Sequence, residues 1–366
     1  MNLLRHTFAA VATTALAASA LQAQTTSTTD PVGFMTIPTP VTNDTIIGAP
    51  LTKPPVFQGA VTSRSNFVIT VSPSPGFGDL TSTLHYVQPV SGPQAGFYFD
   101  VATNSSNSIT LVDNGVTPTG LDPSNTFKVV PYWTIGQIFP TADTNVSFTP
   151  SLGTAVPQRR TLILLPNLTG TGINRAASTT LFWAPDTNNP GTGFWRTTAA
   201  STVNANGTPI LPDSYFTVRN PTNSGTNLAV TIAGNVNTGA ASAQLDSIGS
   251  SANDNYVSLG RPTDITVNDL GLIQSGVFLA SPGTAVPQRR DQLIVISNSV
   301  GGINKAASVT YYYVTNSGTN AWRTTANSAV DAGTNVIQAA IGYIVRKASN
   351  NVPGTQFWTN NISIAP

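Results

Sequence analysis

The chain has no cysteine, no glutamate and few charged residues of any kind. Its 366 residues include 15 acidic residues, all of them aspartate, and charged residues make up 8% of the total, about a third of the usual share. The absence of cysteine excludes disulfides, thiol nucleophiles and sulfur-ligated metal sites. The two histidines are His6 and His85. A histidine-rich zinc site is therefore excluded, and a Ser-His-Asp triad would have to be built around His85 alone.

Nucleotide-binding and hydrolase motifs are also missing. The chain contains no G-x-G-x-x-G, no G-x-x-x-x-G-K-[ST] and no G-x-S-x-G pattern. The first two place backbone amides around phosphate groups, and the third presents a nucleophilic serine at a sharp turn. The sequence therefore gives no support to nucleotide binding, and it indicates neither a reaction nor a cofactor.

Residues 1–23 have the pattern of a secretory signal. Arg5 and His6 give a short polar start, and the apolar and small residues of 7–21 are too few to span a bilayer comfortably. No second apolar run of about 18 residues follows. We therefore expect an exported protein, located outside the cell, at the cell surface or in the periplasm, with no transmembrane segment once the signal is removed.

Removal of residues 1–23 would leave a chain without net charge. The whole chain has 16 basic residues, and loss of Arg5 leaves 15 of them against 15 aspartates. Such a chain has no overall field to attract nucleic acid or anionic lipid. We therefore expect no nucleic-acid partner.

The abundant polar residues favour strands and turns. Threonine fits strands, whereas asparagine, glycine and proline fit turns, and none of them favours helix. The apolar runs are four to six residues long and are separated by proline and glycine, whereas an outer-membrane barrel needs strands of about ten residues. The sequence therefore predicts an all-β protein built of sandwich-like modules.

A duplicated segment organises the second half of the chain. SLGTAVPQRR at 151–160 returns as SPGTAVPQRR at 281–290 with nine of ten positions identical, and GINRAAS at 172–178 returns as GINKAAS at 302–308 with six of seven identical. We predict an N-terminal β-sandwich or small-barrel module at 30–140, followed by two duplicated β-sandwich-like units at 141–250 and 251–366. The polar turns are the parts retained, although surface loops usually change fastest.

Matching strand-like runs follow each copy of the motif. In copy one they are 162–165, 179–183, 194–198 and 215–219, and in copy two they are 293–296, 309–314, 321–325 and 343–346. Four more runs lie in the first module, at 66–71, 96–101, 108–112 and 126–130. The only helix that we expect is one capped turn after Thr134 and one after Thr266. Residues 222–251 are expected to close the first unit and to link it to the second.

The repeated arginine pairs are the first candidate binding residues. Arg159 and Arg160, with Arg289 and Arg290 in the second copy, could grip a carboxylate, sulfate or phosphate by bidentate hydrogen bonds. The favoured alternative is architectural. Gln and Arg would then bond loop carbonyls, and one arginine would pair with a nearby aspartate. In a strand, alternation would also point the two arginines of a pair to opposite faces.

The repeated Trp-Arg pairs are the second candidate. Trp195 with Arg196, and Trp322 with Arg323, could form one carbohydrate platform in each unit, with sugar rings stacked on an exposed indole. The favoured alternative is a buried tryptophan that anchors each sandwich core, because duplicated units repeat their core anchors.

Aspartate chemistry is the third candidate. Asp254, Asp264 and Asp269 lie close in sequence, beside Asn253 and Asn255. A glycosidase needs two carboxylates roughly 5–10 Å apart, but aspartates in Asn- and Gly-rich segments are more often turn residues. Oxygen ligation of Ca²⁺ by this cluster is a lesser alternative, since D-x-[DN]-x-[DN]-G is not present. Otherwise we expect no cofactor.

Three segments carry a resemblance to a family of exported proteins. They are DPVGF at 30–34, DTIIGAPL at 44–51 and VPYWTIGQIFP at 130–140. The chain resembles a paralogous family of secreted proteins from Verrucomicrobia, which share a signal peptide, the DPVGF start, a P-Y-W-T-[LI]-G motif and later W-R and V-R strands. The resemblance covers nearly the whole chain after the signal. It implies export and a β-rich envelope role, and it assigns no activity and no site.

Three functions remain open at this point. The leading hypothesis is a non-enzymatic exported protein of the cell surface or extracellular matrix, structural or adhesive, with cell-envelope polysaccharide or a second copy of itself as partner. The first alternative is a carbohydrate-binding protein with one site per repeat. The second is an aspartate-dependent glycosidase or lyase, which would require two aspartates in one cleft.

Overall fold

Antiparallel sheets account for nearly all of the regular structure, which confirms the predicted all-β class. The computed structural model describes residues 31–186, 192–316, 319–349 and 351–361. From Val32 onward they belong to one unit. The predicted signal at 1–23 lies outside the described residues. In the part of the chain that is described, no helix is both long enough and apolar enough to cross a membrane.

A five-stranded sheet forms the centre of the first unit. Its strands follow the order β13-β12-β11-β15-β2, all antiparallel. Their bounds are β2 (Asn43–Gly48), β11 (Leu162–Leu165), β12 (Thr179–Pro185), β13 (Gly193–Thr197) and β15 (Tyr215–Asn220). The four strands that follow the copy-one motif coincide with the predicted runs, whereas β2 comes from near the start of the chain.

A second five-stranded sheet repeats this arrangement. Its order is β22-β21-β20-β24-β18, and all neighbours are antiparallel. Each strand has the same position in this order as the corresponding strand of the first sheet. The bounds are β18 (Asn253–Val257), β20 (Gln292–Val295), β21 (Val309–Asn316), β22 (Thr319–Thr324) and β24 (Tyr343–Lys347). The two sheets therefore share both their motifs and their strand order.

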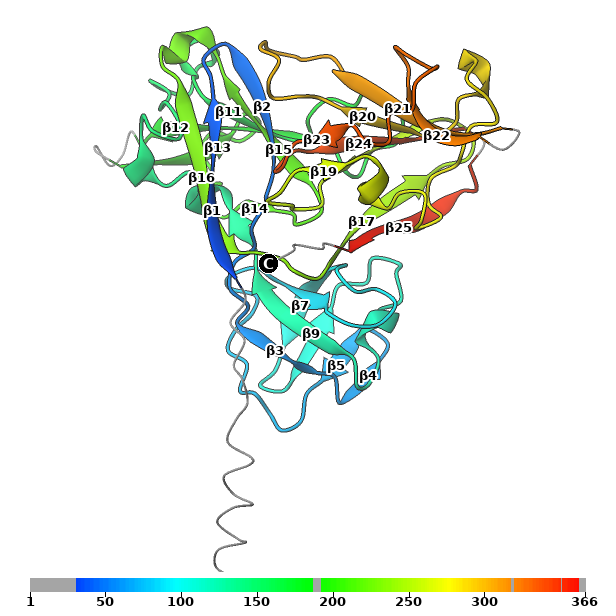
Figure 1. The fold of residues 1–366 in the computed structure, drawn as a ribbon. Helices are drawn as coiled ribbons and strands as arrows, with labels where there is room; N and C mark the ends of the chain where they lie inside the picture. Colours follow the sequence, from blue (N-terminus) through cyan, green and yellow to red (C-terminus); the bar gives the residue numbers. More distant parts are fainter. Residues whose placement is uncertain (1–30, 187–191, 317–318, 350, 362–366) are drawn as a thin grey trace, which may run out of the picture. The chain divides into compact units, whose positions relative to one another are not determined.

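Two-stranded ribbons complete each unit. In the first unit β1 (Val32–Thr39) pairs with β16 (Leu228–Asn235), and β10 (Trp133–Thr134) pairs with β14 (Pro209–Ile210). In the second unit β17 (Ala240–Ser247) pairs with β25 (Gly354–Asn361), and β19 (Ile265–Thr266) pairs with β23 (Val336–Ile337). Figure 1 shows β1 in blue beside β16 in green, and β17 in green beside β25 in red. Each long ribbon joins the first and last strands of its unit.

A seven-stranded sheet, here called the inserted module, lies in the chain between β2 and β10. Its order is β3-β9-β6-β7-β8-β5-β4. The bounds are β3 (Phe57–Ala60), β4 (Ser63–Ser65), β5 (Val68–Thr70), β6 (His85–Pro89), β7 (Phe99–Asn104), β8 (Ser108–Leu111) and β9 (Thr126–Pro131). Because the chain leaves the first unit after β2 and re-enters it at β10, the module is an insertion rather than an N-terminal domain.

The strand pairing thus departs from the predicted boundaries at 30–140, 141–250 and 251–366. Residues 32–48 pair with β16 and β15 and belong to the first unit. Residues 240–247, expected to be part of a linker, form β17 and pair with the last strand of the second unit. These pairings join segments more than a hundred residues apart. Local sequence patterns report strands but not their distant partners.

Each sheet buries one face in its own core. On β15 the alternation of side chains places Phe216 and Val218, both 0% exposed, in the first core, and it turns Thr217 and Arg219 to the opposite face. On β24 Val345 lies in the second core, and the neighbouring Ile344 and Arg346 face away from it. The inserted module has a third core around Phe99, Phe127 and Leu121.

The two expected helical turns are present. α2 (Ile135–Ile138) is the one α-helix of the described residues, and Thr134 and Gln137 form a capping box at its start. The corresponding turn in the second unit is the 3₁₀-helix η5 (Asn268–Leu270), where Thr266 Oγ1 accepts a hydrogen bond from the Asp269 amide at 3.3 Å.

Candidate functional site

The GINKAAS loop of the second unit docks on the first unit. Asn43 Oδ1 accepts a hydrogen bond from the Gly302 amide at 2.9 Å, and the Asp44 amide donates to Gly302 O at 2.9 Å. Asp44 Oδ2 also accepts from the Asn304 amide at 2.8 Å, and Arg219 Nη2 donates to Asn304 Oδ1 at 2.5 Å. Arg219 holds both carboxylate oxygens of Asp44, at 2.8 and 2.7 Å. We call Asn43, Asp44 and Arg219 the first clamp.

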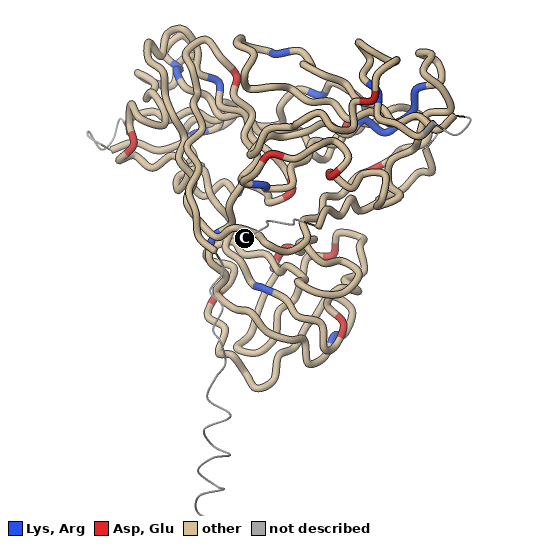
Figure 2. The backbone as a smooth tube through the Cα atoms, in the orientation of Figure 1, with Lys and Arg blue, Asp and Glu red and all other residues tan. Residues whose placement is uncertain are grey.

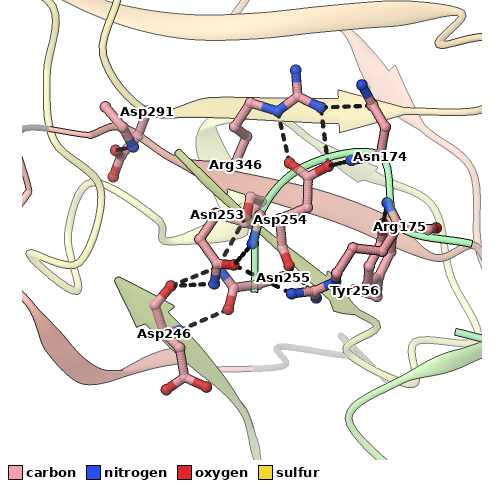
Figure 3. Close-up of polar contacts among 12 residues, drawn as sticks. Asn174, Arg175, Asp246, Asn253, Asp254, Asn255, Tyr256, Asp291 and Arg346 are labelled. Carbon is pink, nitrogen blue, oxygen red and sulfur yellow. Dashed lines mark hydrogen bonds and ion pairs between the residues drawn. The ribbon is translucent and has the colours of Figure 1, made fainter. Parts of the chain in front are cut away.

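The GINRAAS loop of the first unit docks on the second unit in the same way (Figure 3). Asn253 Oδ1 accepts from the Gly172 amide at 2.9 Å, and the Asp254 amide donates to Gly172 O at 3.0 Å. Asp254 Oδ2 accepts from the Asn174 amide at 2.7 Å, and Arg346 Nη2 donates to Asn174 Oδ1 at 2.9 Å. Arg346 holds the carboxylate of Asp254 at 2.6 and 3.0 Å. We call Asn253, Asp254 and Arg346 the second clamp.

The shape of the docked loops explains two of the retained motif positions. Gly172 and Gly302 have φ of +98° and +127°, and Asn174 and Asn304 have φ of +53° and +55°. Positive φ is strained for most residues, but glycine adopts it freely and asparagine tolerates it. This backbone turns the loop so that its amides and carbonyl point at the clamp. The G-x-N pattern is therefore retained because the reciprocal docking requires it.

Each clamp is a well-shielded, bidentate ion pair. The Asp254 side chain is 0% exposed and that of Asp44 is 8% exposed, while the two arginine side chains are each 21% exposed. Hydrogen bonding to Asp44 raises the pKa of Arg219. A buried ion pair compensates its desolvation only when the geometry is good and the other lone pairs are used. Both carboxylates meet this condition, since each also accepts a backbone amide from the docked loop.

A cleft of about 740 Å³ lies between the two five-stranded sheets, beside the clamps. Both sheets line it with the faces that point away from their cores, and matching positions of the two units contribute to it. The lining pairs are Leu164 and Ile294, Pro166 and Ile296, Asn174 and Asn304, Arg175 and Lys305, Ala176 and Ala306, and Ala177 and Ala307. The retained loop residues thus lie at the cleft as well as in the clamps.

The cleft has an excess of positive charge. Charged groups are sparse along the chain (Figure 2), but the cleft is lined by Arg175, Lys305, Arg346 and Asp44. Arg346 is paired with Asp254 and Asp44 with Arg219. The described residues provide no carboxylate in an ion pair with Arg175 or Lys305.

The two unpaired cations are held by oxygens of other kinds. Arg175 Nη2 donates to Asp254 O at 2.5 Å, Nη1 donates to Asn253 Oδ1 at 3.2 Å, and its Cζ lies 5.0 Å from the centre of the Tyr256 ring. Lys305 Nζ lies 3.4 Å from Ser297 O. Burial lowers the pKa of Lys305, and the nearby Asp44 acts in the opposite direction.

The predicted arginine pairs lie elsewhere, at the 3₁₀-helices η3 (Val156–Gln158) and η6 (Val286–Gln288). Arg159 Nε donates to Thr154 O at 3.0 Å and its Cζ lies 4.5 Å from the Phe182 ring centre. Arg289 makes the same contacts with Thr284 O, at 3.3 Å, and with the Tyr312 ring, at 4.8 Å.

The bonds of Arg159 and Arg289 to loop carbonyls agree with the architectural alternative, in which these arginines hold their own loops and bind no ligand. Arg160 and Arg290 donate their backbone amides to Ser151 and Ser281 Oγ, at 3.1 and 2.9 Å. None of the four arginines is among the described residues that line the cleft.

The repeated tryptophans are buried core residues, the alternative that the sequence favoured over a carbohydrate platform. Trp195 is 1% exposed and Trp322 is 2% exposed, and both lie in the cores of their units. Neither indole presents a face on which a sugar could stack, because both strands turn their tryptophan inward. Arg196 is buried too, with its Cζ 3.7 Å from the Phe194 ring centre and a hydrogen bond to Pro185 O at 3.2 Å.

The arginine of the second Trp-Arg pair is less buried than its counterpart. Arg323 donates to Ala329 O at 3.2 Å and is half-buried. Like Arg196, it holds a loop carbonyl of its own unit.

The three clustered aspartates do not share one site. Asp254 is in the second clamp, whereas Asp264 accepts from the Ala339 amide at 2.8 Å and Asp269 accepts from Thr266 Oγ1 at 2.5 Å. Asp264 and Asp269 line a common cavity with Arg261. Within the described residues, no group of three or more His, Cys, Asp or Glu is placed to hold a metal ion.

Asp213 and Asp246, which the sequence did not indicate as a pair, line a cavity of about 370 Å³. Burial raises the pKa of Asp213 to about 6, against hydrogen bonds from Tyr98 and the Gln244 amide that lower it. The Gln244 side chain donates to Asp246 Oδ1 at 3.1 Å, so Gln244 lies between the two carboxylates. In the sequence, Pro-Asp-Ser at 212–214 reads only as a turn.

Comparison of the chain with protein-family models, with curated proteins and with solved structures finds no match.

The sequence reasoning named Asn253 and Asp254 only as possible catalytic or calcium-binding residues and did not pair them with Asn43 and Asp44, although a signal for the pairing exists. The dipeptide Asn-Asp stands at 43–44 and again at 253–254. Its offset is 210 residues, whereas the motif copies are offset by 130, because the inserted module separates β2 from the rest of its unit. A search at one fixed offset therefore misses it.

Proposed function

We propose that the chain is an exported, non-enzymatic protein of the cell surface or extracellular matrix, with a structural or adhesive role. The observation that carries this proposal is the pair of reciprocal clamps. Each clamp joins one unit to the other by a bidentate ion pair and by backbone hydrogen bonds. The residues that are retained in both units thus hold two tandem modules in a fixed relation, as a structural or adhesive protein requires. The resemblance to secreted proteins supports export.

Cell fractionation tests this proposal. The protein should be found in the envelope fraction or the medium, with a cytoplasmic and a periplasmic marker protein followed in the same fractions as controls. The purified chain without residues 1–23 should either sediment with isolated envelope or self-associate. A protein that stays in the cytoplasm, or a purified chain that remains monomeric and binds no envelope fraction, contradicts the proposal.

A second candidate, an aspartate-dependent glycosidase or lyase, is favoured by the cavity that Asp213 and Asp246 share. A carboxyl group with a pKa of about 6 can serve as a general acid near neutral pH. Asp246 lines the same cavity and accepts a hydrogen bond from Thr355 Oγ1 at 2.7 Å. The two aspartates could therefore act as acid and base.

The enzyme candidate is tested by assaying polysaccharides for new reducing ends and for unsaturated products. Asp213→Asn and Asp246→Asn should each abolish any activity, while Asp331→Asn, at an exposed turn that asparagine also fits, should retain it. If the wild-type chain releases no product from neutral or acidic polysaccharides, this candidate is rejected.

A further inference from the structure

The cleft between the units has walls that suit a ligand with both apolar and polar surfaces. Apolar side chains come from Ile46, Ile296 and Ile344, which pack together with Tyr215 and Tyr256. Polar side chains come from Thr217, Gln292 and Thr310. Sugar rings present C–H faces and hydroxyl edges, so they can use both kinds of surface.

The side-chain amide of one asparagine in each matching loop adds a further hydrogen-bond donor to the cleft. Asn174 and Asn304 use Oδ1 to bind their clamp arginines. Their Nδ2 groups take no part in the clamps, and both residues are exposed at the cleft. An amide nitrogen carries two donor hydrogens, which fits the hydroxyl and ring oxygens of a saccharide.

The charge of the cleft selects an acidic ligand. Three cationic residues and one aspartate line it, a formal excess of two positive charges, in a chain that carries a net charge of +1. Arg175 and Lys305 occupy matching positions in the two loops, so the excess is distributed over both units. Lys305 Nζ makes one long hydrogen bond, to Ser297 O at 3.4 Å, so it can bind a ligand carboxylate by a charge-assisted hydrogen bond. Arg175 already donates to Gly170 O, Asn253 Oδ1 and Asp254 O, so it adds positive charge at the matching position.

The geometry favours a saccharide over an acidic peptide. The walls of the cleft are sheet faces, which present side chains, because β11, β15, β20 and β24 each have a strand on both sides. An extended peptide is usually bound by adding a strand to an open sheet edge, where its amides and carbonyls find partners. The edge strands β2 and β18 also contribute to the cleft, but loops of the opposite unit already bond them. Asn298 bonds both the amide and the carbonyl of Ile46, and the Asp254 amide donates to Gly172 O.

The retained alanines explain how the cleft stays open. Ala176, Ala177, Ala306 and Ala307 are exposed and line it. They follow the clamp-binding residues of each loop, and no clamp hydrogen bond needs them. An exposed position usually tolerates many side chains. At these positions, however, a larger side chain would occupy the space of the cleft.

We propose that the inter-unit cleft binds an acidic oligosaccharide, of the uronic-acid class, with a carboxylate on Lys305 and the positive charge of Arg175 at the matching position of the other loop. This inference rests on the proposed surface function for the source of the ligand, a polysaccharide of the cell envelope. It names one site on the boundary between the units, in place of one site in each repeat.

Isothermal titration calorimetry of the chain without residues 1–23 tests the site. The probes are a polyguluronate oligomer, a neutral glucan oligomer of equal length and a poly-aspartate peptide of equal charge. The uronate should bind, and the other two should bind at least about tenfold more weakly, a difference of about 1.4 kcal/mol. No binding of the uronate, or equal binding of the peptide, overturns the inference.

Three variants locate the binding. Lys305→Gln should weaken uronate binding by about tenfold or more, because it removes one charge-assisted contact. Ala306→Trp should abolish binding by filling the cleft. Arg290→Gln, which also removes one positive charge but lies away from the cleft, should bind like the wild type. Equal affinity of Lys305→Gln and Arg290→Gln would overturn the assignment, provided that all three variants unfold at the wild-type temperature.

The two proposals fail in different ways. If the chain binds uronate but remains in the cytoplasm, the proposed site is supported and the proposed surface function is rejected. If the chain fractionates with the envelope but binds no uronate, the surface function is supported and the proposed site is rejected.

Discussion

The second clamp offers the most direct test of how the units are held together. In Asp254→Asn, the carboxamide keeps the size of the carboxylate but loses its charge and turns one acceptor oxygen into a donor nitrogen. In the native protein both Asp254 oxygens act as acceptors, two bonds from Arg346 and one from the Asn174 amide. At least one of these bonds must therefore be lost, and Arg346 is left without its counter-charge.

The expected loss of stability follows from the burial of the pair. Removing one partner of a buried ion pair costs about 3–5 kcal/mol. The 21% exposure of the Arg346 side chain lets water solvate part of the orphaned charge, so we expect the lower end, about 3 kcal/mol. The matched variant Asp44→Asn should lose slightly less, because the Asp44 side chain is 8% exposed whereas that of Asp254 is fully buried.

Urea unfolding, followed by tryptophan fluorescence, measures these losses. The control is Asp331→Asn, whose carboxylate accepts one bond in an exposed turn, and its change should stay within about 0.5 kcal/mol. In the double variant Asp254→Asn and Arg346→Gln, part of the loss should be recovered, because no buried charge remains unpaired. If Asp254→Asn changes the free energy of unfolding by less than about 1 kcal/mol, the clamp does not hold the units as described.

Three further predictions address the loops, the cores and the pH dependence. Gly302→Ala should lose about 1–3 kcal/mol in urea unfolding, because alanine is strained at a φ of +127°; wild-type stability would contradict the assigned loop geometry. Trp322→Ala should lose about 3–5 kcal/mol in the same assay, as a buried indole does, and a loss below about 1 kcal/mol would mean that the indole is exposed. Burial raises the pKa of Asp213 to about 6, so the folded chain holds this proton more tightly than the unfolded chain. The stabilisation from this proton is complete below the unfolded pKa, near 4, and is lost as pH rises through 6. Asp213→Asn should therefore gain stability relative to the wild type between pH 5 and pH 8, and an unchanged difference would show that Asp213 is not buried in this way.

Local features of the structure followed from the sequence because their causes are local. Short apolar runs bounded by glycine and proline predicted the strands of 162–165, 215–219 and 343–346 closely. The capped turn at Thr134 was predicted from its residue type and position. Alternation within a strand and capping at a helix start depend on residues only a few positions apart.

Contacts between segments far apart in the chain could not be predicted from such local patterns. The sequence showed that the G-x-N loops were retained, but it did not show that they dock on Asn43 and Asn253 of the opposite units. It did not show either that the inserted module separates β2 from the rest of its sheet. Such pairings depend on the packing of the whole chain, and no short-range pattern reports them.

The sequence by itself therefore determined the all-β class, the duplicated motif and the chemistries that its residues exclude. The tertiary structure decided which retained residues serve the cores and which face a cleft. Trp195 and Trp322 turn inward to fill the cores, whereas Arg175 and Lys305 line one cleft between the units. The physical reason is that the burial of a side chain and the charges around it depend on contacts between distant parts of the fold. A residue's place in the sequence does not specify those contacts.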